Sequence, residues 1–115
     1  MPLNIIYVDD EVDLLDIFTD MFTSDVISIK TFDNPSEAKK YIVANPPDLI
    51  LLDYRMPDMT GDQLAAELSK TLVSKIPMAL VTGDMEVATQ HKFDKFFKKP
   101  YDVEGMQNYF DSLNK

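Results

Sequence analysis

Hydrophobic residues in this chain form short unbroken runs that alternate with longer segments in which apolar residues recur every three or four positions. The runs have the length of β-strands and cover about Leu3 to Val8, Val26 to Phe32, Leu49 to Leu52, Met78 to Val81, and Phe96-Phe97. The intervening segments have the period of amphipathic helices. Because such alternation is typical of a parallel sheet wrapped by helices, the pattern predicts an α/β fold with five strands and about five helices.

Two of the predicted strands differ in their patterning. The segment from Val26 to Phe32 places Ile27 and Ile29 on one side and polar residues on the other, which suits a strand at the edge of the sheet. The segment from Leu49 to Leu52 is apolar on both faces, and therefore suits the middle of the sheet.

Two helix starts are marked by capping residues. Asn34 is a helix cap followed by Pro35 in the first turn and by Glu37 three positions after the cap. Thr60 and Gln63 form a Thr-x-x-Gln capping box. The apolar residues expected on the inner faces of the helices are Leu14, Leu15, Phe18, Met21 and Phe22, then Ala38, Tyr41 and Ile42, then Leu64, Leu68 and Leu72, and finally Val103, Met106, Phe110 and Leu113.

Polar residues stand where four of the apolar runs end. Asp9 and Asp10 follow the first strand, Asp53 the third, Thr82 the fourth and Lys99 the fifth. In an open parallel sheet the ligand crevice lies outside the carboxyl ends of the strands, so we expect these side chains to meet at one edge. Taken singly, each has a plainer interpretation as an acidic helix start, a turn residue, a cap or a solvated lysine. Their joint occurrence at four strand ends favours a single site.

The residue types at these positions suit phosphate and metal chemistry. Two unit charges ~4 Å apart repel by about 4 kcal/mol at an effective dielectric of about 20, so three clustered carboxylates call for a cation. Oxygen ligands favour Mg²⁺ over zinc. A carboxylate is also a nucleophile toward phosphorus and yields an aspartyl phosphate. That reaction depends on in-line positioning and neutralised phosphoryl oxygens, which Mg²⁺, Lys99 and Thr82 would supply.

Composition narrows the class of protein. The 115 residues fit one domain, spanning 1–115, and 45% hydrophobic residues suffice for one core. The sequence has no cysteine, no apolar run near the ~20 residues of a membrane helix and no signal-peptide pattern, so a cytoplasmic location is expected, with no membrane partner. The net charge of −9 argues against nucleic acid as a partner.

The ordered motifs resemble the receiver domain of response regulators in two-component signalling, and the chain is similar in organisation to the single-domain chemotaxis response regulator. The resemblance runs from Ile5 to about Leu113 and is carried by Val8-Asp9-Asp10-Glu11, by Leu51-Leu52-Asp53-Tyr54-Arg55-Met56-Pro57 with Gly61 after it, by Val81-Thr82-Gly83, and by Lys99-Pro100-Tyr101. It implies a flavodoxin-like doubly wound sheet with strand order 2-1-3-4-5.

The resemblance also implies roles for the site residues. Asp53 matches the phosphorylated aspartate, with Lys99 as the phosphate-pairing lysine. Asp9, Asp10, Asp53 and the backbone carbonyl of Arg55 match the ligands of Mg²⁺, for which Mn²⁺ is an alternative. Asp53, Lys99 and Thr82 would then carry the catalysis of phosphoryl transfer.

Switching and phosphoryl lifetime are assigned by the same resemblance. Thr82 matches the hydroxyl that turns toward the phosphoryl group, and Phe96 matches an aromatic residue that moves inward on activation, although an ordinary core phenylalanine is an equal alternative. Arg55 and Asp84 occupy the positions that tune phosphoryl lifetime. We hypothesise that this cation and anion pair across the site and slow the access of water.

The sequence departs from the family pattern between the fourth and fifth strands. Only 17 positions separate Thr82 from Lys99, so the fourth helix, within Asp84 to Gln90, must be short or irregular. The usual Gly-Ala turn is replaced by His91-Lys92-Phe93-Asp94. A standard dimer through this face is therefore not expected.

The expected function is that of a phosphoacceptor in a two-component or phosphorelay system. A histidine kinase or histidine phosphotransfer protein would donate the phosphoryl group, and a downstream protein target would read the switched surface. The chain would catalyse only its own phosphorylation and dephosphorylation. Two alternatives stay open: a receiver used as a binding module without phosphorylation, and a phosphatase working through an aspartyl phosphate. The phosphatase would require an acid-base aspartate where this chain has Arg55.

Overall fold

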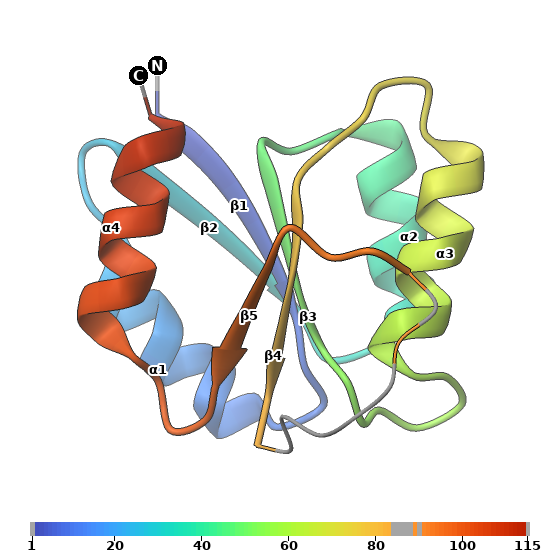
Figure 1. The fold of residues 1–115 in the computed structure, drawn as a ribbon, viewed down its shortest axis with the longest axis horizontal. Helices are drawn as coiled ribbons and strands as arrows, with labels where there is room; N and C mark the ends of the chain where they lie inside the picture. Colours follow the sequence, from blue (N-terminus) through green and yellow to red (C-terminus); the bar gives the residue numbers. More distant parts are fainter. Residues whose placement is uncertain (1, 84–88, 90, 115) are drawn as a thin grey trace.

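A computed structural model describes residues 2–83, 89 and 91–114. Its strands are β1 (Leu3–Val8), β2 (Ile27–Phe32), β3 (Leu49–Asp53), β4 (Met78–Thr82) and β5 (Lys95–Lys98), and its helices are α1 (Val12–Phe22), α2 (Pro35–Ala44), α3 (Gly61–Thr71) and α4 (Val103–Leu113). All strand pairs are parallel, and the sheet has the order β2-β1-β3-β4-β5 (Figure 1). The predicted fold class and strand order are confirmed.

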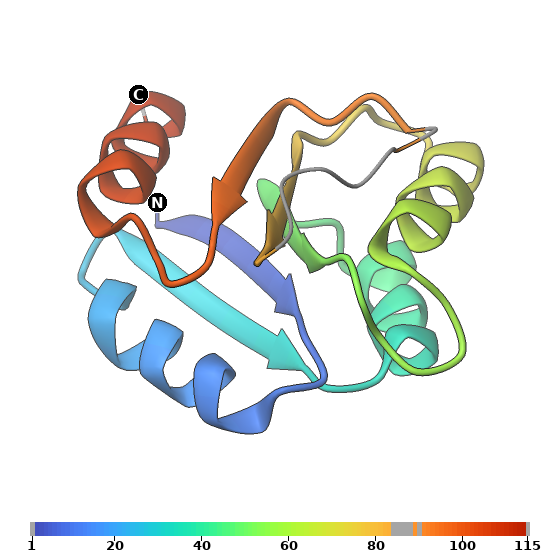
Figure 2. The same cartoon turned by 60° about the horizontal axis from the view of Figure 1, so that its bottom comes forward.

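The helices form two layers around the sheet. Helices α1 and α4 cover one face, and α2 and α3 cover the other (Figures 1 and 2). Strand β1 serves both layers because its side chains alternate: Tyr7 joins the core beneath α1 and α4, whereas Ile6 and Val8 join the core beneath α2 and α3. As predicted, β2 lies at an edge and the wholly buried β3 lies in the middle.

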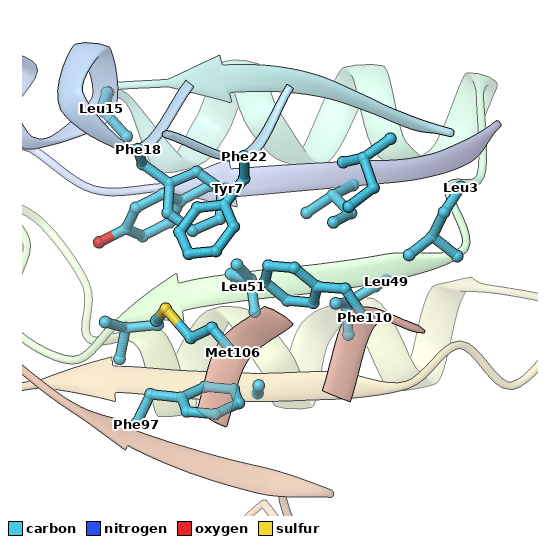
Figure 3. Packing of buried hydrophobic residues seen from close by; sticks show 14 residues of the cluster. Leu3, Tyr7, Leu15, Phe18, Phe22, Leu49, Leu51, Phe97, Met106 and Phe110 are labelled. Atoms are coloured by element: carbon cyan, nitrogen blue, oxygen red, sulfur yellow. The ribbon is translucent and has the colours of Figure 1, made fainter. Parts of the chain in front are cut away.

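Aromatic rings dominate the core under α1 and α4 (Figure 3). The ring of Phe18 packs edge-on against Tyr7 at 4.8 Å between centroids, and Phe22 packs in the same manner against Phe110 at 5.2 Å. Such edge-to-face pairs stabilise the core beyond the area they bury. They also fix the ring of Tyr7 at the carboxyl end of β1.

Both predicted helix starts are present. Oδ1 of Asn34 accepts the amide of Glu37 at 3.0 Å. Thr60 and Gln63 form the reciprocal capping box, in which each side chain accepts the other residue's amide. These caps satisfy amides that have no partner within the helix.

The inner faces of two helices are narrower than predicted. Met21 is 41% exposed and Val103 is 45% exposed, so the expectation that these two residues belong to the inner faces of their helices was wrong. In α1, Leu15, Phe18 and Phe22 already fill the space above the sheet. Met21 lies on the flank of that stripe and faces water.

The segment before β5 is attached to the α3 layer. The amide of His91 donates to Oδ1 of Asp62 in α3 at 2.8 Å, and the amide of Asp94 donates to the carbonyl of Met78 at 2.9 Å. The predicted fourth helix falls almost wholly on residues outside the described part of the chain. The described residues themselves form four helices. Among those described residues, none of the helices has both the length and the apolar character that crossing a membrane requires.

Candidate functional site

The carboxyl ends of the strands point to one edge of the sheet, which comes forward in Figure 2. A cleft of about 380 Å³ opens there. It is lined by Asp10, Glu11, Asp53, Arg55, Thr82, Gly83 and Lys99. The parallel sheet thus brings together residues far apart in sequence, as the pattern of strand ends predicted.

Lys99 occupies the centre of the charged cluster. Its ammonium Nζ lies 2.8 Å from Oδ2 of Asp9, 3.2 Å from Oδ1 of Asp53 and 3.4 Å from Oε1 of Glu11. Only 15% of the lysine side chain is exposed. Its main chain is fixed as well, because the amide of Lys99 donates to the carbonyl of Thr82 at 3.0 Å and the Lys99–Pro100 peptide bond is cis.

Asp9 is fully buried and receives three donors. Oδ2 accepts the hydroxyl of Tyr7 at 2.7 Å and the ammonium of Lys99 at 2.8 Å, and Oδ1 accepts the amide of Glu11 at 2.9 Å. A buried carboxylate is costly unless it is hydrogen-bonded and paired. Here both oxygens are satisfied, so the Asp9 carboxylate is held in one orientation.

The electrostatics of Asp53 and Lys99 are coupled. Burial, together with the negative charge of Asp9, raises the pKa of Asp53 to about 7, although Lys99 opposes this shift. Burial alone would lower the pKa of Lys99, but its hydrogen bond to Asp9 and the charges of Asp9 and Asp53 raise it instead. The lysine is therefore a permanent cation, whereas Asp53 is a carboxylate that the metal-free site does not fully compensate.

The acidic residues at this edge fit a hard divalent cation. One carboxylate oxygen from each of Asp9, Asp10, Glu11 and Asp53 lies within 4.8 Å of the others. A set made only of oxygens matches Mg²⁺ or Mn²⁺ and not a metal that prefers nitrogen or sulfur. Lys99 alone does not neutralise these four negative charges, and a divalent cation would complete the compensation.

The loop after β3 is held close to Asp53 by Gly61. The amide of Gly61 donates to the carbonyl of Tyr54 at 2.9 Å. A Cβ atom at position 61 would collide with the backbone carbonyl of Asp53. Only glycine permits this approach, and the loop between the two residues includes Asp58 with a positive φ of 71°.

The remaining predicted site residues differ in placement. Thr82 is buried at the end of β4, and Arg55 is exposed at the rim of the cleft. Phe96 does not line the cleft: its side chain is 44% exposed, and its ring lies 5.7 Å from that of Phe93. Asp84 lies outside the described residues.

Sequence reasoning missed three residues that touch this cluster: Glu11, Tyr7 and Tyr101. The hydroxyl of Tyr7 lies between Asp9 and the hydroxyl of Tyr101, which is 3.1 Å away. Burial and the negative charge of Asp9 raise the pKa of Tyr7, so its hydroxyl stays protonated. A signal was present, because residues two apart on a strand share a face and Tyr7 lies two before Asp9.

These observations define a class of protein: a doubly wound parallel sheet with an acidic cation site and a lysine at its carboxyl edge. A family model described as "Response regulator receiver domain" matches residues 5–111. The chain belongs to the response regulator receiver domain family.

Curated relatives are about 30% identical to the chain over the aligned residues. It is 30% identical to the transcriptional regulatory protein GlrR of Escherichia coli over an alignment of 115 positions that covers 96% of this chain and 26% of that protein. It is 30% identical to the regulatory protein VanRc of Enterococcus gallinarum over 104 residues, which are 88% of this chain and 45% of that protein. The chain thus spans a quarter to just under half of these relatives.

Solved receiver structures share the fold throughout. A CheY-like receiver domain from Methylobacillus flagellatus has a TM-score of 0.86 at 17% identity, covering 98% of this chain and 99% of that one. The response regulator TrrA from Thermotoga maritima, in complex with Mg²⁺-BeF, has a TM-score of 0.85 at 23% identity, covering 98% and 99% of the two chains.

Proposed function

We propose that residues 1–115 form one receiver domain that accepts a phosphoryl group from phosphohistidine onto Asp53 and thereby switches a protein-binding surface. One observation carries the proposal. The Asp53 carboxylate lies at the floor of an open cleft, 3.2 Å from the ammonium of Lys99 and inside a cluster of oxygen ligands. Receiver-family membership supports the same assignment.

Asp53 would act as the nucleophile. One of its carboxylate oxygens bonds to phosphorus while the phosphorus–nitrogen bond of the donor breaks, and the bonding pair returns to the imidazole nitrogen. The product is an aspartyl phosphate, and its added negative charge stays beside Lys99. Lys99 would orient the phosphoryl group and compensate charge on its oxygens, which is the main requirement of this reaction.

Asp9, Asp10, Asp53 and the backbone carbonyl of Arg55 would hold Mg²⁺, with Mn²⁺ as a substitute. When bound, the ion supplies positive charge to the carboxylates and to the incoming phosphoryl oxygens. Glu11 belongs to the same cluster of oxygens and would keep the site strongly acidic. In the metal-free protein, Lys99 is shared among three carboxylates.

Thr82 and Phe96 would convert phosphorylation into a change of surface. The Thr82 hydroxyl would turn toward the new phosphoryl oxygens, which are strong acceptors. Its carbonyl already accepts the amide of Lys99, so both residues would respond together. Phe96, now 44% exposed, would move inward and alter the face that a partner contacts.

The partners follow from this chemistry. A histidine kinase or a histidine phosphotransfer protein would supply the phosphoryl group, and a downstream protein target would read the switched surface. The net charge of −9 disfavours direct contact with nucleic acid or an anionic membrane surface, and we propose a cytoplasmic location. Arg55 and Asp84 would set the lifetime of the aspartyl phosphate.

Intact mass after incubation with acetyl phosphate and Mg²⁺ tests the proposal. We expect one phosphoryl increment on the wild type, its loss on removal of Mg²⁺, and its absence in Asp53→Asn. Asp58→Asn is the matched control, because Asp58 is an exposed aspartate in the same loop with a φ of 71° that asparagine tolerates. An increment that persists in Asp53→Asn, or no increment even with an active histidine kinase, would contradict the proposal.

A further inference from the structure

Tyr7 combines a fully buried ring with a hydroxyl at the functional site. Its side chain has no exposed surface. The ring packs against Phe18 at 4.8 Å and against Tyr101 at 6.3 Å. Figure 3 shows the hydroxyl directed toward the carboxyl ends of the strands, where it reaches Oδ2 of Asp9 at 2.7 Å. A residue of the aromatic core thus donates one hydrogen bond to the acidic cluster from the buried side of the site.

A count of protons sets the direction of this hydrogen-bond chain. A tyrosine hydroxyl has one proton, and the Asp9 carboxylate accepts only. The proton of Tyr7 therefore points to Asp9, and the oxygen of Tyr7 is left to accept. The hydroxyl of Tyr101 lies 3.1 Å from that oxygen and 3.2 Å from the carbonyl of Leu14, so its single proton is donated to one of these two acceptors at a time. Tyr101 thus lies between the first turn of α1 and the Tyr7 hydroxyl.

Tyr7 and Lys99 share one oxygen of Asp9. Lys99 lies 2.8 Å from that oxygen and must also serve Asp53, 3.2 Å away. A hydrogen bond to a charged acceptor is stronger than one between neutral groups, so the Tyr7 hydroxyl removes part of the attraction that Asp9 exerts on cations. Without it, Asp9 would hold both Lys99 and a divalent cation more tightly.

We propose that Tyr7 is a positioning residue that tempers the charge of Asp9, so that Asp9 holds Mg²⁺ and Lys99 loosely enough for Lys99 to move onto the phosphoryl group of Asp53. This inference rests on the proposed phosphoacceptor function. It predicts opposite effects on two measurable quantities when the hydroxyl is removed. Mg²⁺ binding becomes tighter, and phosphorylation at saturating Mg²⁺ becomes slower.

Tyr7→Phe tests the inference, because it deletes the hydroxyl and keeps the ring in the core. We expect calorimetric Mg²⁺ titration of the unphosphorylated protein to give an affinity about threefold to tenfold higher than wild type, which corresponds to a fraction of the energy of one hydrogen bond to a charged group. At saturating Mg²⁺, phosphorylation by acetyl phosphate should slow by a similar factor. Tyr109→Phe is the matched control, since its hydroxyl has no hydrogen bond to Asp9, and it should change neither quantity.

A higher Mg²⁺ affinity combined with a lower phosphorylation rate distinguishes a positioning role from a merely structural one. Loss of a merely structural residue would lower both the affinity and the rate. Parallel losses in Tyr7→Phe, or values equal to those of Tyr109→Phe, overturn the inference. If Tyr7→Phe does not fold, Tyr101→Phe removes a hydroxyl that is able to donate to Tyr7, and it should give the same signs with a smaller size. A wild type that takes no phosphoryl group would instead refute the proposed function, so the two failures are distinguishable.

Discussion

Thr82 and Lys99 are joined through the main chain: the amide of Lys99 donates to the carbonyl of Thr82 over 3.0 Å. The hydroxyl proposed to turn toward the phosphoryl group and the ammonium proposed to bind it therefore belong to one hydrogen-bonded pair at the ends of two adjacent strands. A shift of either backbone would be passed to the other through this hydrogen bond. We therefore expect the proposed switch to begin as a displacement of β4 and β5 at this edge.

Removal of the Lys99 charge should impair both phosphorylation and stability. In Lys99→Gln, Asp9 and Asp53 stay buried without their cation, which should lower the metal-free free energy of unfolding by about 3 kcal/mol at neutral pH. The phosphorylation rate should fall at least about tenfold, the scale of losing one charge-stabilising group. Urea unfolding and acetyl-phosphate kinetics measure the two effects. Lys98→Gln, at the exposed neighbouring lysine, should leave both near wild type.

Stability of the metal-free protein should fall as pH rises toward neutrality. The pKa of Asp53 rises from 3.8 to about 7 in the folded protein, so the folded state keeps a proton that the unfolded chain loses first. A raised pKa contributes stability below about pH 4 that is lost as pH increases through about 7. Urea unfolding in EDTA should show wild type losing stability relative to Asp53→Asn across this window. Parallel curves for the two proteins would refute the assigned pKa, and Mg²⁺ should reverse the loss.

Gly61→Ala should distort the loop that carries the phosphoacceptor. The added Cβ would meet the backbone carbonyl of Asp53, and overpacking of this kind costs about 1–3 kcal/mol. We expect a lower urea midpoint and slower phosphorylation, because relief of the collision displaces Asp53. Gly83→Ala is the matched control for stability, since a Cβ there meets nothing within 4 Å. Equal unfolding curves for the two variants would show that the loop yields without strain.

Arg55→Asn should shorten the lifetime of the aspartyl phosphate. Arg55 lies at the rim of the cleft, and its bulk and charge would limit the approach of water to the phosphoryl group. Loss of the side chain should speed dephosphorylation several-fold, measured as decay of the phosphorylated mass after the donor is removed. Arg55→Lys keeps the charge and should decay at an intermediate rate. A decay rate unchanged in Arg55→Asn would discard this role.

The fold followed from patterns that are local in sequence. Strand lengths, the edge patterning of β2 and the caps at Asn34 and Thr60 depend on neighbouring residues, and the structure has each of them. The exposure of Met21 and Val103 was missed because helical period defines a stripe but not its width. That width depends on how closely the helix approaches the sheet.

The gathering of Asp10, Asp53, Thr82 and Lys99 around one cleft was predictable because parallel strands end at a common edge. The contacts of Tyr7 were overlooked, because a tyrosine in an apolar run is normally a core residue, although its spacing of two from Asp9 places both residues on one face. The hydrogen-bond partners of the Tyr7 hydroxyl, Asp9 and Tyr101, become evident only when the three residues are seen packed together in the structure. Glu11 was likewise passed over, because its distance to Lys99 depends on the turn between β1 and α1.

The outer strands of the sheet carry a consequence for assembly. β2 presents the exposed Lys30, and β5 presents the exposed Lys95 and Lys98. Charged side chains on an edge strand, lysines above all, oppose the docking of a further strand. Both edge strands therefore disfavour edge-to-edge association of sheets from two molecules. The protein is acidic overall, yet it has positive charge on the two strands where such association would begin.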